Sequence, residues 1–362
     1  MSRPLKILIV DHAPIFGGVE AMIRDLVGAA DSGAFALTLV TDNASPVQFN
    51  WPDARRVPLP RLRRNPAAMF WAGAGLARLA RTADVLMTTT ARTHAIGSVA
   101  ASLSQTPLIW RLADDTLPPA LARAFAPIPK RIVAVSAYMA GRCSPQPAKT
   151  VIIPDGLPNP GLTPPGMRQS ARAALGLRPD ERVALSVARL VRWKGHTLFA
   201  RAVKLSGVTG LIAGGEDESE GELGGKGLRE ELETMCGVSG RSNERPYRLL
   251  GHRADLRELF AACDVFAHTS TRPEPFGRAV VQAMMAGIPV AASHSGAIAE
   301  VVGEAGRLFP SGDAVGLAAA LAMDERTRVR LGREGRERAL ARFELGAMTR
   351  RLEEVWRDAA GV

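Results

Sequence analysis

The feature that most limits what this chain can fold into is a regular alternation of short apolar runs and helix-like stretches. Between the first two apolar runs, Val19, Met22, Ile23 and Leu26 have the spacing that places them on one face of a helix. Strand, helix and strand repeated in this order predict parallel sheets covered by helices on both faces, the doubly wound α/β fold. The expected strands lie at residues 7–10, 37–40, 85–89, 108–112, 132–135, 151–153, 183–187, 211–213, 247–250, 265–268 and 290–292.

The length of the chain, 362 residues, favours two such domains over one. Residues 154–179 are rich in proline and glycine and interrupt the alternation, so we interpret them as a linker. The expected architecture is two Rossmann-like domains, residues 1–165 and 166–344, that face one another across a cleft. Residues 216–227 form an acidic, glycine-rich loop that we expect to be mobile, and a last helix is expected over residues 345–357.

Composition and cysteine usage favour a globular protein of a reducing compartment. Hydrophobic residues make up 46% of the chain and charged residues 23%, which argues against disorder. Cys143, Cys236 and Cys263 are far apart and form no CxxC pair, so they fit neither a disulfide framework nor a zinc site. No apolar stretch approaches the length of a membrane span, and the first one is too short for a signal peptide. We therefore expect a cytoplasmic protein.

The net charge of +10 raises the question of an acidic partner. Seven arginines and no acidic residue lie between Arg55 and Arg81. One interpretation is a solvated, arginine-rich surface. The other is peripheral contact with an anionic surface, such as phospholipid at the inner face of the membrane, a lipid-linked acceptor or a phosphorylated glycan. Nucleic acid is disfavoured as a partner, because few aromatic residues are interleaved with the arginines and no nucleic-acid motif is present.

Cations and glycines follow two expected strands of the second half. Arg189 and Lys194 come directly after the strand at 183–187, at the edge where parallel sheets bind ligands. The planar fork of an arginine and the compact charge of a lysine both suit phosphate oxygens, although loop cations are usually only solvated. Gly251, His252 and Arg253 follow the strand at 247–250, where a glycine lets the backbone approach a flat nucleobase; a plain turn is the other interpretation.

The strongest motif begins with Glu274 and leads into a helix, which Gly277 opens and Gly287 ends. Free amides at a helix start form an anion site, and the helix dipole strengthens it. Glu274 can accept hydrogen bonds from sugar hydroxyls, while Gln282, one turn beyond Arg278, can reach a ribose hydroxyl. Residues 295–300 are a second glycine-opened helix start, or simply a cap. Together these motifs predict a site for a diphosphate with a sugar at its end.

In this order and spacing, the motifs resemble family 4 of the glycosyltransferases, the retaining enzymes of the GT-B fold. The likeness is dense from residue 183 to residue 312 and thinner before that. The residues that carry it are Gly17-Gly18-Val19-Glu20, Arg189 with Lys194-Gly195, Glu274-Pro275-Phe276-Gly277, Ala283-Met284 and Gly287-Ile288-Pro289-Val290.

The resemblance implies that the second domain binds a nucleotide-diphosphate sugar as donor, most often a UDP-hexose and next a GDP-hexose. Arg189 and Lys194 match the pair that stabilises the leaving diphosphate, so no metal ion and no cofactor is expected. Glu274 matches the acid that holds the donor-sugar hydroxyls, and Gln282 stands where the family has a second acid. The implied donor residues are Gly18, Arg189, Lys194, Gly251, His252, Arg253, Glu274, Phe276, Gly277, Arg278 and Gln282, with Arg189, Lys194 and Glu274 as the catalytic ones.

The first domain is implied to bind the acceptor, a hydroxyl of a glycan, a lipid-linked molecule or a small molecule. Gly17 and Glu20 belong to its glycine loop. Many relatives carry a His-Asp pair where this chain has Ala113 and Asp114, and His94 either serves a neighbouring role or is a structural histidine. Residues 345–362 resemble the closing helix of the family, which crosses back to the first domain.

Two other functions stay open at this point. A nucleotide-sugar epimerase of the same fold uses acids of the cleft to remove and return a proton, but its motif spacing differs from that around Glu274. A non-catalytic protein that binds carbohydrate or nucleotide sugar fits the departures at Gln282 and Ala113, whereas the intact pair of cations favours an enzyme. A dinucleotide dehydrogenase is disfavoured, because the first glycine loop does not extend into the GxGxxG fingerprint.

Overall fold

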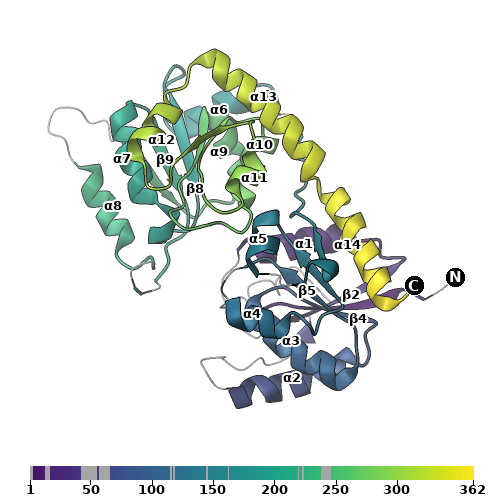
Figure 1. Cartoon of the computed structure of the whole chain (residues 1–362). Helices are drawn as coiled ribbons and strands as arrows, with labels where there is room; N and C mark the ends of the chain where they lie inside the picture. Colours follow the sequence, from purple (N-terminus) through teal and green to yellow (C-terminus); the bar gives the residue numbers. More distant parts are fainter. Residues whose placement is uncertain are drawn as a thin grey trace. The chain divides into compact units, whose positions relative to one another are not determined.

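The computed structural model describes residues 3–12, 17–41, 55–56, 66–114, 116, 119–143, 146–161, 163–218, 220–221, 224–237 and 246–362. The chain divides into two compact units. The first is made of Met1–Pro158 together with Phe343–Val362, and the second of Asn159–Arg342. Figure 1 shows that each unit is built around a sheet with helices packed against it.

The first unit contains seven parallel strands in the order β3-β2-β1-β4-β5-β6-β7. Its strands are β1 Leu5–Val10, β2 Phe35–Thr41, β3 Arg55–Arg56, β4 Val85–Thr88, β5 Leu108–Leu112, β6 Arg131–Ala134 and β7 Thr150–Ile152. Its helices are α1 Gly18–Ala29, α2 Pro66–Ala80, α3 Ala91–Ser104, α4 Pro119–Phe125, α5 Ala137–Cys143 and α14 Leu345–Ala360. The central strands are buried along almost their whole length, which explains their continuous apolar runs.

Helix α14 completes the core of the first unit, although it comes last in the chain (Figure 1). Met348, Leu352 and Trp356 recur every four residues and are buried in one cluster with side chains of α1, β1 and β2. The Trp356 ring meets the ring of Phe35 edge-on, with 5.2 Å between centroids. The last helix is therefore part of the core of the first unit rather than an appendage to it.

The second unit contains six parallel strands in the order β10-β9-β8-β11-β12-β13. Its strands are β8 Val183–Val187, β9 Thr209–Ala213, β10 Tyr247–Gly251, β11 Val265–His268, β12 Val290–Ser293 and β13 Arg307–Phe309. Its helices are α6 Met167–Ala174, α7 His196–Ser206, α8 Leu228–Cys236, α9 Leu256–Ala262, α10 Arg278–Met285, α11 Ile298–Val302, α12 Ala314–Leu321 and α13 Glu325–Arg342.

Each sheet has one place where the order of its strands reverses direction. This switch point lies between β1 and β4 in the first unit and between β8 and β11 in the second. Loops that leave the carboxyl ends of the two strands at such a point diverge to opposite faces, and ligands of doubly wound folds bind in the crevice between them. The predicted α/β fold is confirmed, and each expected strand is present. Among the described strands, only the short edge strands β3 and β13, which carry arginines, were not predicted.

One expectation about a loop is wrong. The segment interpreted as a linker contains α6, which packs in the second unit because its Arg172 is buried and donates to the Ala262 carbonyl at 2.8 Å. In the loop at 216–227, Asp217 is buried, and a Cβ on Gly225 would lie 2.2 Å from the Leu190 carbonyl oxygen, whereas Glu216, Glu218 and Lys226 are exposed. The mobility of this loop stays a prediction. No helix among the described residues is both long enough and apolar enough to cross a membrane.

Candidate functional site

The switch point of the second unit brings Lys194 and Glu274 into contact. Lys194 ends a short 3-10 turn, Arg192–Lys194, in the loop after β8, and Glu274 lies between β11 and α10. The Lys194 ammonium donates a hydrogen bond to Oε1 of Glu274 and lies 4.0 Å from the centroid of the Trp193 ring. The two loops that leave the switch point are thus joined by an ion pair.

Glu274 is buried and is held through a single oxygen. Besides Lys194, Ser270 Oγ donates to Oε1 at 2.5 Å, and Nε2 of His268 lies 3.3 Å from it. Burial by itself raises the pKa of Glu274, but the charge of Lys194 and the hydrogen bond from His268 outweigh it and hold this pKa well below its usual range. The carboxylate is therefore ionised at neutral pH. Since no described residue donates to Oε2, that oxygen can accept a hydrogen bond from a ligand.

Gly195 explains how closely the two loops approach. Its φ is +72°, and a Cβ there would lie 2.0 Å from the Thr269 carbonyl oxygen. Thr269 Oγ1 donates to the Lys194 carbonyl at 2.7 Å, and the Thr271 amide donates to the Trp193 carbonyl at 2.8 Å. A glycine after the lysine is required, because any side chain there would push the two loops apart.

Gly296 fixes the backbone of Glu274 from the other side. Its φ is +61°, and a Cβ on it would lie 2.4 Å from the Glu274 carbonyl oxygen and 2.5 Å from its nitrogen. The Ala297 amide donates to the same carbonyl at 2.9 Å. The start of α11 is at Ile298, so Gly296 positions the acid rather than opening a helix. Gly277, with φ +94°, precedes α10 as expected.

Arg189 is fixed at both its backbone and its side chain. Its carbonyl oxygen lies 2.9 Å from Nε2 of His196, and its Nη1 donates to Oδ2 of Asp217 at 2.7 Å. Burial lowers the pKa of His196 to about 4, so the ring is neutral and donates its Nε2 proton to that carbonyl. The side chain of Arg189 is still 45% exposed, which leaves part of the guanidinium open to a ligand.

The other predicted donor residues have less direct links to this pair. Gly251 has φ +68°, and His252 is exposed, but β9 separates their strand from β8. Phe276 is buried at 5% exposure, so its ring is part of the interior of the unit. On α10, Arg278 and Gln282 are both half-buried and one turn apart. The ion pair of Arg253 is with Asp255.

Four residues of this site, Asp217, His196, His268 and Ser270, were not predicted from the sequence. Asp217 follows β9, His196 begins α7, and His268 ends β11. The sequence did contain a signal for these residues: each is polar, and each lies near the carboxyl end of a predicted strand, where doubly wound sheets bind ligands.

In the first unit, Gly17, Gly18 and Glu20 lie at the start of α1, and Asp114 follows β5. Gly17 caps α1, Gly18 is its first residue, and the Gly17 amide donates to Oε2 of the buried Glu20 at 2.6 Å. Asp114 Oδ1 accepts from the Ala91 amide at 3.2 Å, at the start of α3. Residues 13–16, which complete the first glycine loop, lie outside the described part of the chain.

Asp11 is a further acid at the switch point of the first unit, and it too was not predicted. It directly follows β1, is fully buried, and accepts a hydrogen bond from Thr89 Oγ1 at 2.6 Å. Burial, and then the charge of Glu20, raise the pKa of Asp11 to about 7. Among the described residues its Oδ2 has no hydrogen-bond partner. An acid directly after the first strand was the signal in the sequence.

His94 lies in the interior of the first unit rather than on a surface that an acceptor could reach. Its ring is fully buried, stacks on Trp110 with 4.0 Å between centroids, and has Nδ1 3.2 Å from Thr88 Oγ1. Burial lowers its pKa to about 3, so it is neutral. This environment is that of a structural histidine, and we do not include His94 in the proposal below.

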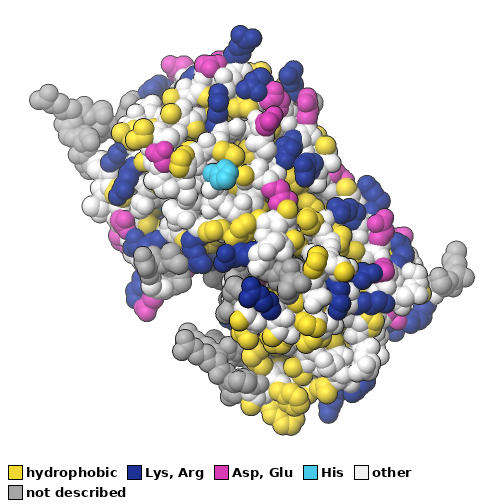
Figure 2. All heavy atoms as spheres, in the orientation of Figure 1, with side chains coloured by type: hydrophobic (Ala, Val, Ile, Leu, Met, Phe, Trp, Pro, Cys, Tyr) yellow, Lys and Arg dark blue, Asp and Glu magenta, His cyan; other side chains and the backbone are white. Residues whose placement is uncertain are grey.

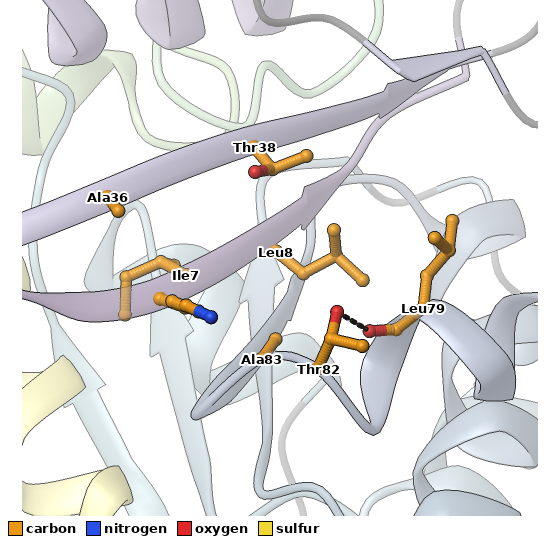
Figure 3. Close-up of a pocket in the computed structure, with 8 residues that line it drawn as sticks. Ile7, Leu8, Ala36, Thr38, Leu79, Thr82 and Ala83 are labelled. Atoms are coloured by element: carbon orange, nitrogen blue, oxygen red, sulfur yellow. Dashed lines mark hydrogen bonds between the residues drawn. The ribbon is translucent and has the colours of Figure 1, made fainter.

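A small cavity of about 180 Å³ lies in the first unit, beside the first half of β1 (Figure 3). Ile7, Leu8, Ala36 and Thr38 line it from β1 and β2, and Leu79 and Thr82 close it, with Thr82 Oγ1 donating to the Leu79 carbonyl at 2.8 Å. The described residues that line it include no cluster of acids or cations suited to a charged ligand. Over the same described part of the chain, no three His, Cys, Asp or Glu side chains are grouped as a metal site.

Most of the second unit is similar to a known family of proteins. The family model "Glycosyl transferases group 1" matches residues 167–338. The D-inositol 3-phosphate glycosyltransferase of Mycobacterium marinum is 38% identical over 160 residues, which are 43% of this chain and 33% of that protein. The enzyme of the same name from Mycobacterium tuberculosis is 39% identical over 183 residues, 49% of this chain and 36% of that protein. The chain thus covers about a third of the length of these relatives.

Solved structures match nearly the whole chain. Anabaena HepE in complex with UDP-glucose has a TM-score of 0.84 at 23% identity and covers 98% of this chain and 100% of its own. WaaG, a glycosyltransferase involved in lipopolysaccharide biosynthesis, has a TM-score of 0.70 at 15% identity and covers 99% and 100%. The fold is that of the GT-B glycosyltransferases. The segment that matches the family model "Glycosyl transferases group 1", residues 167–338, contains Arg189, Lys194 and Glu274.

Proposed function

We propose that this chain transfers a hexose from a nucleoside diphosphate sugar to a hydroxyl group, with retention of configuration. The observation that carries the proposal is the contact between Lys194 and the ionised, buried Glu274, with Arg189 in the same loop as the lysine. The family match and the two relatives named glycosyltransferases support it. UDP is the first candidate for the nucleotide, because HepE was solved with UDP-glucose, and GDP is the next.

In the proposed reaction, the bond between the anomeric carbon and the diphosphate breaks, and negative charge grows on the leaving nucleotide. Arg189 and Lys194 are fixed before the reaction, so they can stabilise this charge without reorganisation. Glu274 binds hydroxyls of the donor sugar through Oε2. The acceptor hydroxyl attacks the face that the diphosphate leaves, and its proton passes to a phosphate oxygen. The two cations do the work of a metal ion, so the proposed reaction needs none.

The acceptor is proposed to bind at the switch point of the first unit. Gly17 and Gly18 begin α1 there without side chains, Glu20 accepts from the Gly17 amide, and Asp114 accepts from the Ala91 amide at the start of α3. Asp11 adds a carboxyl group with a pKa near neutrality. Carboxyl groups of this kind accept hydrogen bonds from hydroxyls, which suits a glycan, a lipid-linked sugar or a small polyol.

The donor is tested by thermal unfolding with UDP, GDP, ADP and their common sugar conjugates in the presence of EDTA. A ligand that binds only the folded state at 100 times its Kd adds about 2.7 kcal/mol of stability, which raises Tm measurably. We expect one nucleotide to stabilise the wild type and to lose this effect in Arg189→Ala. Stabilisation that requires an added divalent metal would contradict the metal-free mechanism, and no stabilisation by any nucleotide would contradict the whole proposal.

A second candidate function is a non-catalytic protein that binds nucleotide sugars. Gln282, on α10 where a second acid is expected, favours it. Release of free sugar from the donor separates the two, because an enzyme of this type slowly transfers its sugar to water when no acceptor is present. A protein that binds the donor and releases none over several hours is the binding protein.

We further propose that the first unit contacts an anionic phospholipid surface. Phe70 and Trp71 of α2, here called the aromatic pair, are 49% and 72% exposed and pack edge-on with 5.8 Å between centroids. Figure 2 shows hydrophobic side chains gathered over α2. Arg78, in the last turn of the same helix, and Arg81, directly after it, are exposed. An exposed tryptophan with its polar indole N–H, a neighbouring apolar ring and cations in the same segment suit the headgroup region of an anionic membrane. Residues 57–65 of the arginine-rich run lie outside the described part of the chain.

Flotation with vesicles tests this contact. We expect the wild type to float with vesicles that contain phosphatidylglycerol and not with pure phosphatidylcholine, and the double variant Phe70→Ser/Trp71→Ser to float with neither. Leu205→Ser is the matched control, because Leu205 is 62% exposed on α7 of the second unit. Equal and negligible flotation with both vesicle types would exclude the membrane contact.

A further inference from the structure

The cation Arg189 meets a carboxylate that plays no part in the reaction described above. Nη1 of Arg189 donates to Oδ2 of Asp217 at 2.7 Å, and Asp217 exposes only 5% of its side chain against 45% for Arg189. Among the described residues, no other hydrogen bond is made by the guanidinium of Arg189. One edge of the guanidinium is therefore fixed on a buried acid, and its remaining N–H groups are free to bind a ligand.

The backbone around Asp217 is built to hold the acid in place. A Cβ on Gly225 would lie 2.3 Å from the Asp217 carbonyl oxygen and 2.2 Å from that of Leu190, so only glycine fits between them. Leu190 forms a parallel bridge with Glu216, and its amide donates to the Gly215 carbonyl at 2.9 Å. The loop after β9 thus packs directly against the loop that carries Arg189.

We propose that Asp217 is a positioning residue that orients the Arg189 guanidinium for the diphosphate of the donor. This inference rests on the proposed function, since it assigns a second partner to the same cation. Burial of the acid fixes its position, and the planar fork of arginine transmits that position to the N–H groups on the far side. An arginine oriented in advance loses less side-chain entropy when it binds phosphate.

The charge of Asp217 and its role in positioning Arg189 have opposite effects on the affinity for the donor, so removing the acid distinguishes them. By charge alone, removing a carboxylate beside an anion site strengthens binding of the anion, because the repulsion disappears. By position, removing it weakens binding, because the guanidinium loses its fixed orientation. The sign of the change in affinity therefore separates the two roles without any assumption about magnitude.

The experiment measures the Kd of UDP by isothermal titration calorimetry for the wild type, Asp217→Asn and Glu216→Gln. Glu216→Gln is the matched control. This variant removes the same charge one residue away, but the ion-pair partner of Glu216 is Arg229, at 2.7 Å, and not Arg189. We expect Asp217→Asn to raise the Kd about tenfold, as expected for the loss of one ordered charge-assisted contact. Glu216→Gln should change it less than about twofold, the usual effect of an exposed charge. In an Arg189→Ala background, Asp217→Asn should change the Kd no further, which a purely structural role would not produce.

An Asp217→Asn protein that binds UDP as tightly as the wild type, or more tightly, overturns the inference and leaves the proposed function standing. Equal weakening by Glu216→Gln also overturns it. A wild type that binds neither UDP nor GDP overturns the proposed function and this inference with it. If Asp217→Asn does not fold, as judged by circular dichroism, Asp217→Glu takes its place. That variant keeps the charge and moves the carboxylate, so weaker binding supports the inference and unchanged binding overturns it.

Discussion

The ion pair between Lys194 and Glu274 leads to a quantitative prediction about stability. Lys194 exposes 19% of its side chain and Glu274 exposes 8%, so Lys194→Ala leaves a desolvated carboxylate without its cation. Breaking a buried pair in this way costs about 3 to 5 kcal/mol, and the partial exposure of the lysine places this case near the lower limit, at about 3 kcal/mol. In a unit of the size of Asn159–Arg342, this corresponds to a fall in Tm of about 6 to 12 °C.

The pH dependence of the loss identifies its cause. In the wild type the pKa of Glu274 is lowered, so the stability that it contributes is present above its unfolded value of 4.5 and is lost as pH falls below that value. In Lys194→Ala, burial acts without the opposing charge and raises this pKa. The destabilisation should therefore be full at pH 8 and become smaller as pH falls and the carboxylate takes up a proton.

Urea unfolding followed by far-UV circular dichroism at pH 8 and pH 6 measures both effects. The double variant Lys194→Ala/Glu274→Gln is the control, because it removes the stranded charge together with its partner and should recover at least half of the loss. A single variant that unfolds at the same urea concentration as the wild type at both pH values would refute the reasoning. It would mean that water, and not the lysine, balances the charge of Glu274.

Three further predictions concern single residues. Gly296→Ala should lower turnover about a hundredfold by displacing Glu274, and it should also lower Tm. Gly312→Ala is its control: Gly312 has φ +84° and no atom within 4 Å of where its Cβ would lie, so this variant should lower Tm but not turnover. Donor turnover and thermal unfolding measure the two effects. Because burial raises the pKa of Asp11 from 3.8 to about 7, the wild type loses stability as pH rises between these values. Asp11→Asn should therefore stabilise the protein by about 4 kcal/mol at pH 8 and by less at pH 5; urea midpoints at both pH values check this. The pKa of His94 is lowered to about 3, so the folded wild type resists protonation of this ring and loses stability as pH falls from 6.5 to 4. His94→Gln should make this loss of stability smaller in the same assay.

The strands could be predicted from the sequence because a sheet that is buried on both faces needs uninterrupted apolar runs. β8 and β11 lie where the pattern placed them, at Val183–Val187 and Val265–His268. Helix α6 was mistaken for part of a linker because prolines and glycines flank it on both sides. Its position depends on Arg172, whose buried hydrogen bonds to backbone carbonyls no local pattern reveals.

The candidate site was predictable in its residue types but not in its contacts. The hydrogen bond from Lys194 to Glu274 joins residues 80 positions apart, and only the order of the strands brings their loops together. Gly195 and Gly296 have the sequence signature of ordinary turn glycines, and their close approach to neighbouring backbone exists only in the fold. Asp217 could not be distinguished from the other acids of its loop, because its burial comes from tertiary packing.

The position of α14 in the core of the first unit has a consequence for synthesis on the ribosome. The strands of that unit emerge first, but Met348, Leu352 and Trp356, which cover part of their apolar surface, emerge only after all of Asn159–Arg342. At a translation rate of about 5 to 20 residues per second, the wait is roughly 10 to 40 s. The second unit emerges during that time, so the half of the protein that is made first cannot complete its core until the half that is made second has emerged.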